Sequence, residues 1–271
     1  MVIALMAFLA ATAAVPAMGG PSPAASKAFD DYATKLEAQI TREESAVASF
    51  VFAAGSTASH GAQEAARRGE VIAEPGGQAT VEVPGGLIHH WVGTVFIPHA
   101  SVTQVLGVVQ DYDHLARYYS PRVINSRLIS RQGDDFQTAL RMREHEVVTV
   151  VMDSEYEVKY GRLDAAHQFS FSRSTRIAEI ADAGGAHERV VPAAENHGYL
   201  WRLNSYWRFV DQDDGVLVQC EAISLTRDIP TGLGWAVGPF VRAIPRETLE
   251  ATLAATRDAV EERVRVESAK K

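Results

Sequence analysis

The feature that most constrains the fold is an alternation of apolar and polar residues that runs from residue 123 to residue 228 and is followed by a helical stripe. Turn signals interrupt it at residues 133–135, near Gly161, at residues 184–185 and at residues 213–215. Because side chains alternate between the two faces of a strand, the pattern predicts about six antiparallel strands. The stripe then predicts a long C-terminal helix across the sheet. Its members are Leu249, Leu253, Thr256, Val260 and Val264.

Shorter elements precede this region. Leu87 to Pro98 is rich in β-branched and aromatic residues and predicts a strand. Ser101 suits the cap of a following helix, and a second short helix is predicted to end at Tyr119. Further upstream, the spacing predicts an amphipathic helix over about 28–45. Residues 49–86 are expected to be irregular with short strands.

Composition excludes several classes of function. The 271 residues are 46% hydrophobic and 22% charged, which is typical of a soluble protein with a core. A formal net charge of -8 argues against nucleic acid as a partner. The one cysteine, Cys220, excludes an intramolecular disulfide and a zinc site of several thiolates, and its parity predicts a buried, inert thiol.

The sequence predicts neither a cofactor nor a metal. It contains no phosphate-binding loop, nucleophile elbow or zinc-protease motif. His89 and His90 are neighbours in a predicted strand, so their side chains point to opposite faces and do not suit one ion. We expect both histidines at the surface.

The first 17 residues form an uncharged apolar run that ends in small residues. This predicts a signal peptide and a periplasmic or secreted protein, although no Lys or Arg precedes Lys27. An uncleaved anchor or a misassigned start is the alternative. The predicted division is 1–17 signal peptide, 18–86 helical and irregular extension, and 87–268 the main folded domain.

Strand parity predicts which side chains face the core. In the predicted hairpin of residues 136–160 the even positions are apolar, among them Met142, Met152 and Tyr156. In the last hairpin the odd positions are predicted to face inward: Tyr199, Trp201, Leu203, Trp207 and Phe209. The polar even positions Arg202, Asn204, Tyr206 and Arg208 are predicted on the opposite side.

Two segments carry a family resemblance. Residues 105–121 (VLGVVQDYDHLARYYSP) and 229–256 (IPTGLGWAVGPFVRAIPRETLEATLAAT) resemble the opening helices and the closing helix of the START and polyketide-cyclase (SRPBCC) superfamily. The resemblance covers about 87–262. It implies an α+β helix-grip fold, in which a strongly bent antiparallel sheet wraps around the C-terminal helix and leaves a cavity for a lipid, sterol or polyketide. The N-terminal helix would be an extension to that fold.

We therefore expect the chain to bind or carry a hydrophobic small molecule. Ordinary core packing is the alternative role for the aromatic face. The expected ligand-binding residues are Met142, Met152, Tyr156, Phe169, Phe171, Arg173, Tyr199, Trp201, Trp207, Phe209, Trp235 and Phe240.

Arg173 shares the parity of Phe169 and Phe171, which predicts an inward arginine that needs a partner. Glu144 or Glu146 is the predicted partner; a β-bulge that reverses the parity, or a place at the rim, is the alternative. Residues 231–244 are apolar and contain glycines, which suggests transient membrane contact or a rigid connector.

Two other functions stay open. A cyclase or aromatase would use a cavity acid or base such as Glu144, Tyr156 or Arg173. A ligand-free interaction module of the cell envelope would have a filled interior. The sequence assigns no catalytic residue.

Overall fold

The structure is a computed structural model that describes residues 19–45, 50, 60–145, 149–229 and 234–270; for residues 60–63 and 234–240 it describes the backbone only. The predicted signal peptide and Glu146 lie outside these ranges, and the side chains of Trp235 and Phe240 are not described.

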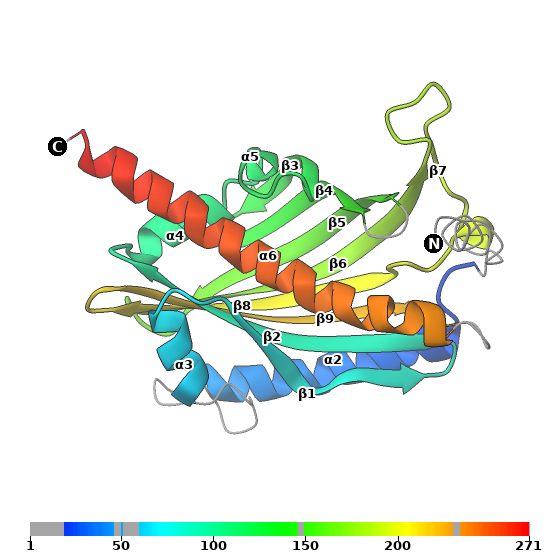
Figure 1. The fold of residues 1–271 in the computed structure, drawn as a ribbon, viewed down its shortest axis with the longest axis horizontal. Helices are drawn as coiled ribbons and strands as arrows, with labels where there is room; N and C mark the ends of the chain where they lie inside the picture. The colour runs from blue at the N-terminus through cyan, green and yellow to red at the C-terminus, as the bar shows by residue number, and fades with distance from the viewer. Residues whose placement is uncertain (1–18, 46–49, 51–59, 146–148, 230–233, 271) are drawn as a thin grey trace, which may run out of the picture.

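The described strands form one nine-stranded antiparallel sheet in the order β1-β2-β9-β8-β6-β5-β4-β3, with β7 paired to β6. In Figure 1, β3 to β6 rise on one side of the long helix α6 while β2, β8 and β9 run along the other, so the sheet bends around the helix. The strands are β1 (Ile72–Val83), β2 (Gly86–Pro98), β3 (Val123–Gln132), β4 (Asp135–His145), β5 (Thr149–Arg162), β6 (His167–Ala181), β7 (Arg189–Val190), β8 (Arg202–Gln212) and β9 (Gly215–Arg227).

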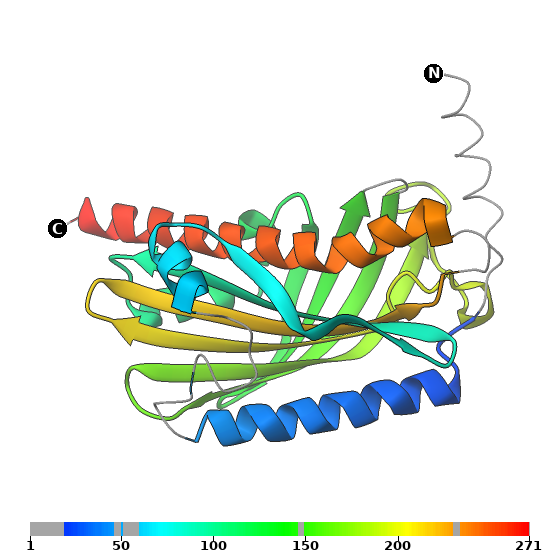
Figure 2. The same cartoon turned by 60° about the horizontal axis from the view of Figure 1, so that its bottom comes forward.

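Helices cover both faces of the sheet. α6 (Gly234–Ser268) crosses one face, here called the α6 face, and α2 (Pro23–Glu43) covers the other, the α2 face (Figure 2). The predicted α+β helix-grip fold is therefore confirmed, with α2 as the extension. The shorter elements are α3 (His60–Arg67), α4 (Val102–Val109), α5 (Leu115–Tyr118) and the 3-10 turn η2 (Ala193–Glu195).

The core on the α6 face joins the C-terminal helix to the central strands. Leu249, Leu253 and Val260 pack with Val95 and Val218 in one buried cluster. Gly93 of β2 permits this close approach, because a Cβ atom there would lie 2.4 Å from Cδ1 of Leu253. A side chain at position 93 would push α6 away from the sheet.

The core on the α2 face confirms the predicted N-terminal helix. Ser22 caps it by accepting a hydrogen bond from the Ala25 amide (3.0 Å), and Pro23 starts it. Phe29, Leu36 and Ile40 are buried against the sheet at helical spacing, where their cluster includes apolar residues of β2, β8 and β9.

The region before Leu87 is more regular than its sequence predicts. β1 pairs with β2 along most of its length, with a register shift between Pro75 and Thr80. Pro75, Gly76 and Gly77 weaken the strand signal, but Gly76 makes room for the ring of His90, whose Nε2 atom would lie 2.1 Å from a Cβ at position 76.

The predicted surface position of the two histidines is wrong. His89 and His90 are 1% and 3% exposed, because β2 lies between β1 and β9 and is covered on both faces. His90 contacts Tyr32 (2.8 Å) and Glu221 (2.7 Å) on the α2 face. His89 contacts Thr226 (3.1 Å) on the α6 face, where burial lowers its pKa to about 4.

Candidate functional site

The strongest candidate site lies on the α6 face where β4 and β5 meet the helices. Cross-strand pairing sets Phe136 opposite Val158, Thr138 opposite Tyr156 and Met142 opposite Met152, which places the even positions of both strands on one face as predicted. A buried cluster there joins the strands to α5 and to the segment before it. Its members are Tyr112, Leu115, Phe136, Tyr156, Val158 and Tyr160.

The predicted face of β6 is wrong for its aromatic residues. Phe169 pairs with Arg208 and Phe171 with Tyr206, so both rings lie on the α2 face. The serines that follow each of them, Ser170 and Ser172, take the α6 face. The reason is the register between β6 and β8, which depends on hydrogen bonds between strands and cannot be read from one strand's parity.

A β-bulge then reverses the parity of β6. Tyr156 pairs with Ser174 and Glu155 with Arg176, so Thr175 is the extra residue. Ile177 and Glu179 consequently face α6, whereas Arg173 faces α2. The bulge lies beyond Arg173, which keeps the parity of Phe169 and Phe171 and faces α2 with them.

The predicted pairing of Arg173 with Glu144 does not form. Arg173 is half-exposed and donates two hydrogen bonds to Glu37 of α2, at 2.7 and 2.8 Å. Glu144 does lie on the α6 face, but it pairs with Arg122 and accepts a hydrogen bond from Thr248 of α6 (3.4 Å). The partner of Arg173 comes from the N-terminal extension, whose position the sequence does not reveal.

The other predicted aromatic residues divide between the two faces. Trp207 and Phe209 belong to the core beneath α6, with stacked rings 6.1 Å apart. Trp201 packs in the α2 cluster instead. Tyr199 is 42% exposed and stacks on His197. The predicted ligand-binding residues therefore do not form one surface.

Tyrosine hydroxyls supply the polar groups of the α6 face. Tyr112 and Tyr160 share a hydrogen bond (2.8 Å), and Tyr119 bonds Thr256 of α6 (3.0 Å). Tyr156 is 6% exposed, and its hydroxyl finds no acceptor among the described residues. The hydroxyl of Ser154, two residues earlier, donates to the Leu140 carbonyl oxygen (3.2 Å) and lies near enough to Tyr156 to lower its pKa slightly, but it does not form a hydrogen bond of good geometry with Tyr156.

Burial keeps these groups uncharged. It raises the pKa of Tyr119 and of Tyr156 to about 12, and it raises those of Tyr112, Tyr160 and the Cys220 thiol further. At neutral pH the tyrosines can donate hydrogen bonds but cannot act as bases. Cys220 is buried, which agrees with the predicted inert thiol. The face therefore suits binding better than acid–base chemistry.

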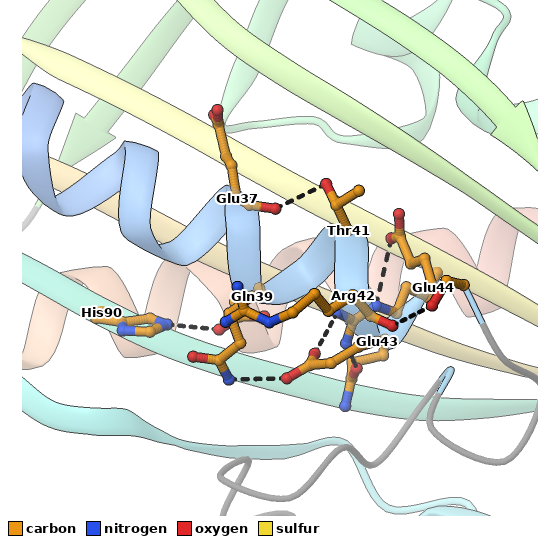
Figure 3. Close-up of polar contacts among 11 residues, drawn as sticks. Glu37, Gln39, Thr41, Arg42, Glu43, Glu44 and His90 are labelled. Carbon is orange, nitrogen blue, oxygen red and sulfur yellow. Dashed lines mark hydrogen bonds and ion pairs between the residues drawn. The ribbon is translucent and has the colours of Figure 1, made fainter.

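A second polar cluster lies beneath α2, and the sequence patterns do not predict it. Arg208, predicted on the polar side of its strand, is 2% exposed and bonds Glu43 (2.8 Å), Glu44 (3.4 Å) and Gln219 (2.8 Å). Figure 3 shows the carboxylates at the end of α2 pointing toward the strands. No local pattern in the sequence marks this cluster, because its charges come from α2 and β8, which are far apart in the chain.

Glu44 gives this cluster a pH dependence. Burial raises its pKa to about 7, against the attraction of Arg208. The folded state therefore holds the Glu44 proton more tightly than the unfolded chain does, so stability is lost as pH rises from about 4.5 to 7. His89 acts in the opposite sense, because its lowered pKa removes stability as pH falls below its usual value of 6.5.

The variant Glu44→Gln should separate these effects. We expect the difference in free energy of unfolding, Glu44→Gln minus the unaltered protein, to increase by about 2 kcal/mol from pH 5 to pH 8. The unaltered protein loses stability over this range because it must ionise a buried carboxyl, whereas the variant has none. Urea denaturation at several pH values measures the difference. A difference that stays constant across this range would contradict the assignment.

Comparison with known proteins gives likeness only at the level of fold. No protein family model and no curated protein matches the sequence. A STAR-related lipid transfer protein from Xanthomonas axonopodis matches at 18% identity over 68% of this chain and 99% of that chain, with a TM-score of 0.44. An aromatase/cyclase from Streptomyces sp. R1128 matches at 14% identity over 66% of this chain and 94% of that one, with a TM-score of 0.42. Human STARD10 matches at 10% identity over 66% and 72% of the two chains, with a TM-score of 0.40.

Proposed function

We propose that this chain binds a hydrophobic small molecule of lipid type on the α6 face, between α6 and the strands β4, β5 and β6. The observation that carries the proposal is Tyr156, a buried hydroxyl donor without an acceptor, whose immediate neighbours on the face are apolar or carry hydroxyls. A buried donor left without a partner costs about 1 to 3 kcal/mol. An oxygen atom of a bound ligand would remove that cost.

The residues around Tyr156 support binding of an apolar body. Leu140, Leu203 and Tyr119 pack against the same cluster, while Met142 and Met152 extend the face toward the end of β4. Methionine side chains adapt to ligands of irregular shape. A ligand here would need to displace or rearrange some of these side chains.

Filling the α6 face tests the proposal. Ser172 lies on that face, opposite Val158 of β5 and Ser205 of β8. We expect Ser172→Phe to reduce the amount of lipid captured from a mixed lipid extract at least about tenfold, because the ring occupies space that the ligand needs. Native mass spectrometry of the full chain measures the bound mass.

A variant on the other face of the neighbouring strand provides the control. Glu157 of β5 is exposed and pairs with Arg173 on the α2 face, so Glu157→Phe should leave capture unchanged. Equal capture by the unaltered protein and Ser172→Phe would contradict the proposed site. If neither the unaltered protein nor either variant captures a ligand, the result would instead favour the ligand-free interaction module.

An enzyme of cyclase or aromatase type has less support. Of its three candidate residues, Arg173 lies on the α2 face, Glu144 is paired with Arg122, and Tyr156 is held in its neutral form by burial. Conversion of a captured polyketide, followed by mass spectrometry, would be the finding that favours it.

We also propose that the protein acts outside the cytoplasm and touches membranes transiently through residues 231–244. The apolar sequences of residues 1–17 and 231–244 support this. Among the helices in the described part of the chain, none is long and apolar enough to span a bilayer. Fractionation of the native host, followed by intact-mass measurement, tests export and cleavage together.

A further inference from the structure

The surroundings of Tyr156 restrict the chemistry of a ligand at the proposed site. Thr138 lies directly opposite on β4 and Ser174 directly opposite on β6, while Ser154 and Val158 flank Tyr156 along β5. All four are uncharged. The Ser174 hydroxyl accepts a hydrogen bond from the Leu203 amide (2.9 Å), and the Ser154 hydroxyl donates to the Leu140 carbonyl oxygen without forming a hydrogen bond of good geometry with Tyr156. Tyr156 is therefore the donor in this group that lacks an acceptor.

The nearest charged residues of β4 and β6 on this face are both acidic. Glu144 near the end of β4 pairs with Arg122, and Glu179 near the end of β6 accepts a hydrogen bond from His197 (2.7 Å). The arginine of the first pair is held by its carboxylate and by Thr248. An anionic headgroup beside Tyr156 would therefore meet neutral hydroxyls; further along the face lie two carboxylates and, at the other end, the exposed Arg131 over the ring of Phe136.

Resting on the proposed function, we infer that the ligand is a neutral molecule with a carbonyl, ester or ether oxygen that accepts a hydrogen bond from Tyr156, and that fatty-acid and phosphate headgroups are disfavoured. A neutral oxygen needs only one donor, which Tyr156 supplies. A carboxylate or phosphate loses its hydration on entering such a face and needs a cation in return, and the described neighbours of Tyr156 provide none.

Two probes of equal chain length test the inference: 2-dodecanone, which is neutral, and dodecanoate, which is an anion. Binding to the full chain is measured by titration calorimetry at neutral pH. We expect the unaltered protein to bind 2-dodecanone at least about tenfold more tightly than dodecanoate. We expect Tyr156→Phe to weaken the binding of 2-dodecanone by about three- to tenfold and to leave that of dodecanoate unchanged.

Tyr160→Phe provides a matched control for stability. It removes a hydroxyl that bonds Tyr112, so its free energy of unfolding should fall by about 1 kcal/mol. Tyr156→Phe removes a hydroxyl without an acceptor and should be as stable as the unaltered protein or more so. If Tyr156→Phe loses as much stability as Tyr160→Phe, the Tyr156 hydroxyl has an acceptor in the ligand-free protein and the inference fails.

The remaining outcomes separate the two proposals. Equal or tighter binding of dodecanoate, or an unchanged affinity of Tyr156→Phe for 2-dodecanone, would overturn the neutral-ligand inference while the binding function stands. If neither probe binds and the lipid extract also gives no captured mass, the proposed function itself fails.

Discussion

Replacing Arg208 with methionine is expected to lower the free energy of unfolding by about 3 to 5 kcal/mol. The guanidinium is almost fully buried between β8 and the end of α2, where it bonds Glu43, Glu44 and Gln219. Methionine has a similar length but donates no hydrogen bond. The buried Glu44 carboxyl would lose the cation that offsets its desolvation, and urea denaturation at pH 8 would measure the loss.

Two further variants distinguish the buried cluster from ordinary ion pairing. Arg173→Met removes a half-exposed pair with Glu37 and should cost no more than about 1 kcal/mol. Adding Glu43→Gln and Glu44→Gln to Arg208→Met should restore much of the lost stability, because neutral groups of similar volume carry little desolvation cost. If Arg208→Met is as stable as Arg173→Met, the buried cluster stabilises the fold no more than a half-exposed ion pair does, and the prediction is wrong.

Phe29→Ala is expected to destabilise the protein by about 3 to 5 kcal/mol as well, through packing rather than charge. The Phe29 side chain is fully buried between α2 and the sheet, and the guanidinium of Arg202 lies 5.3 Å from its ring centroid. Alanine would leave a cavity at the centre of the α2 cluster and weaken the attachment of the helix. Thermal and urea unfolding both measure the effect.

The exposed face of the same helix provides the reference. Lys35 points to solvent, so Lys35→Ala should change the free energy of unfolding by less than about 0.5 kcal/mol. If Phe29→Ala were equally mild, α2 would not be an integral layer of the fold. The large expected cost means that the N-terminal extension stabilises the sheet from the side opposite the proposed ligand.

Local patterns were sufficient to predict most elements from Leu87 onward and one face of the candidate site, but not α3 and β1. The even positions of β4 and β5 face α6 as predicted, because both strands belong to one hairpin and keep their parity throughout their pairing. The stripe on α6 and the cap at Ser101 were also visible in the sequence, since helical spacing and capping involve residues within a few positions of one another.

Relations between distant strands could not be predicted in this way. The faces of Phe169, Phe171 and Arg173 depend on the register of β6 with β8, and the bulge at Thr175 then reverses the parity within one strand. The α2 helix also buries polar residues that would face solvent if only α6 covered the sheet, notably His90 and Arg208.

The sequence by itself therefore determined the order of the elements from Leu87 onward and the apolar face of the β4–β5 hairpin, because these follow from interactions over short distances along the chain; the helix-grip class is what the family resemblance implied. Only the tertiary structure decided which charges pair, which histidines are buried and which tyrosine lacks an acceptor. Those properties depend on hydrogen bonds and burial between segments far apart in sequence, such as Glu37 with Arg173 and Tyr32 with His90.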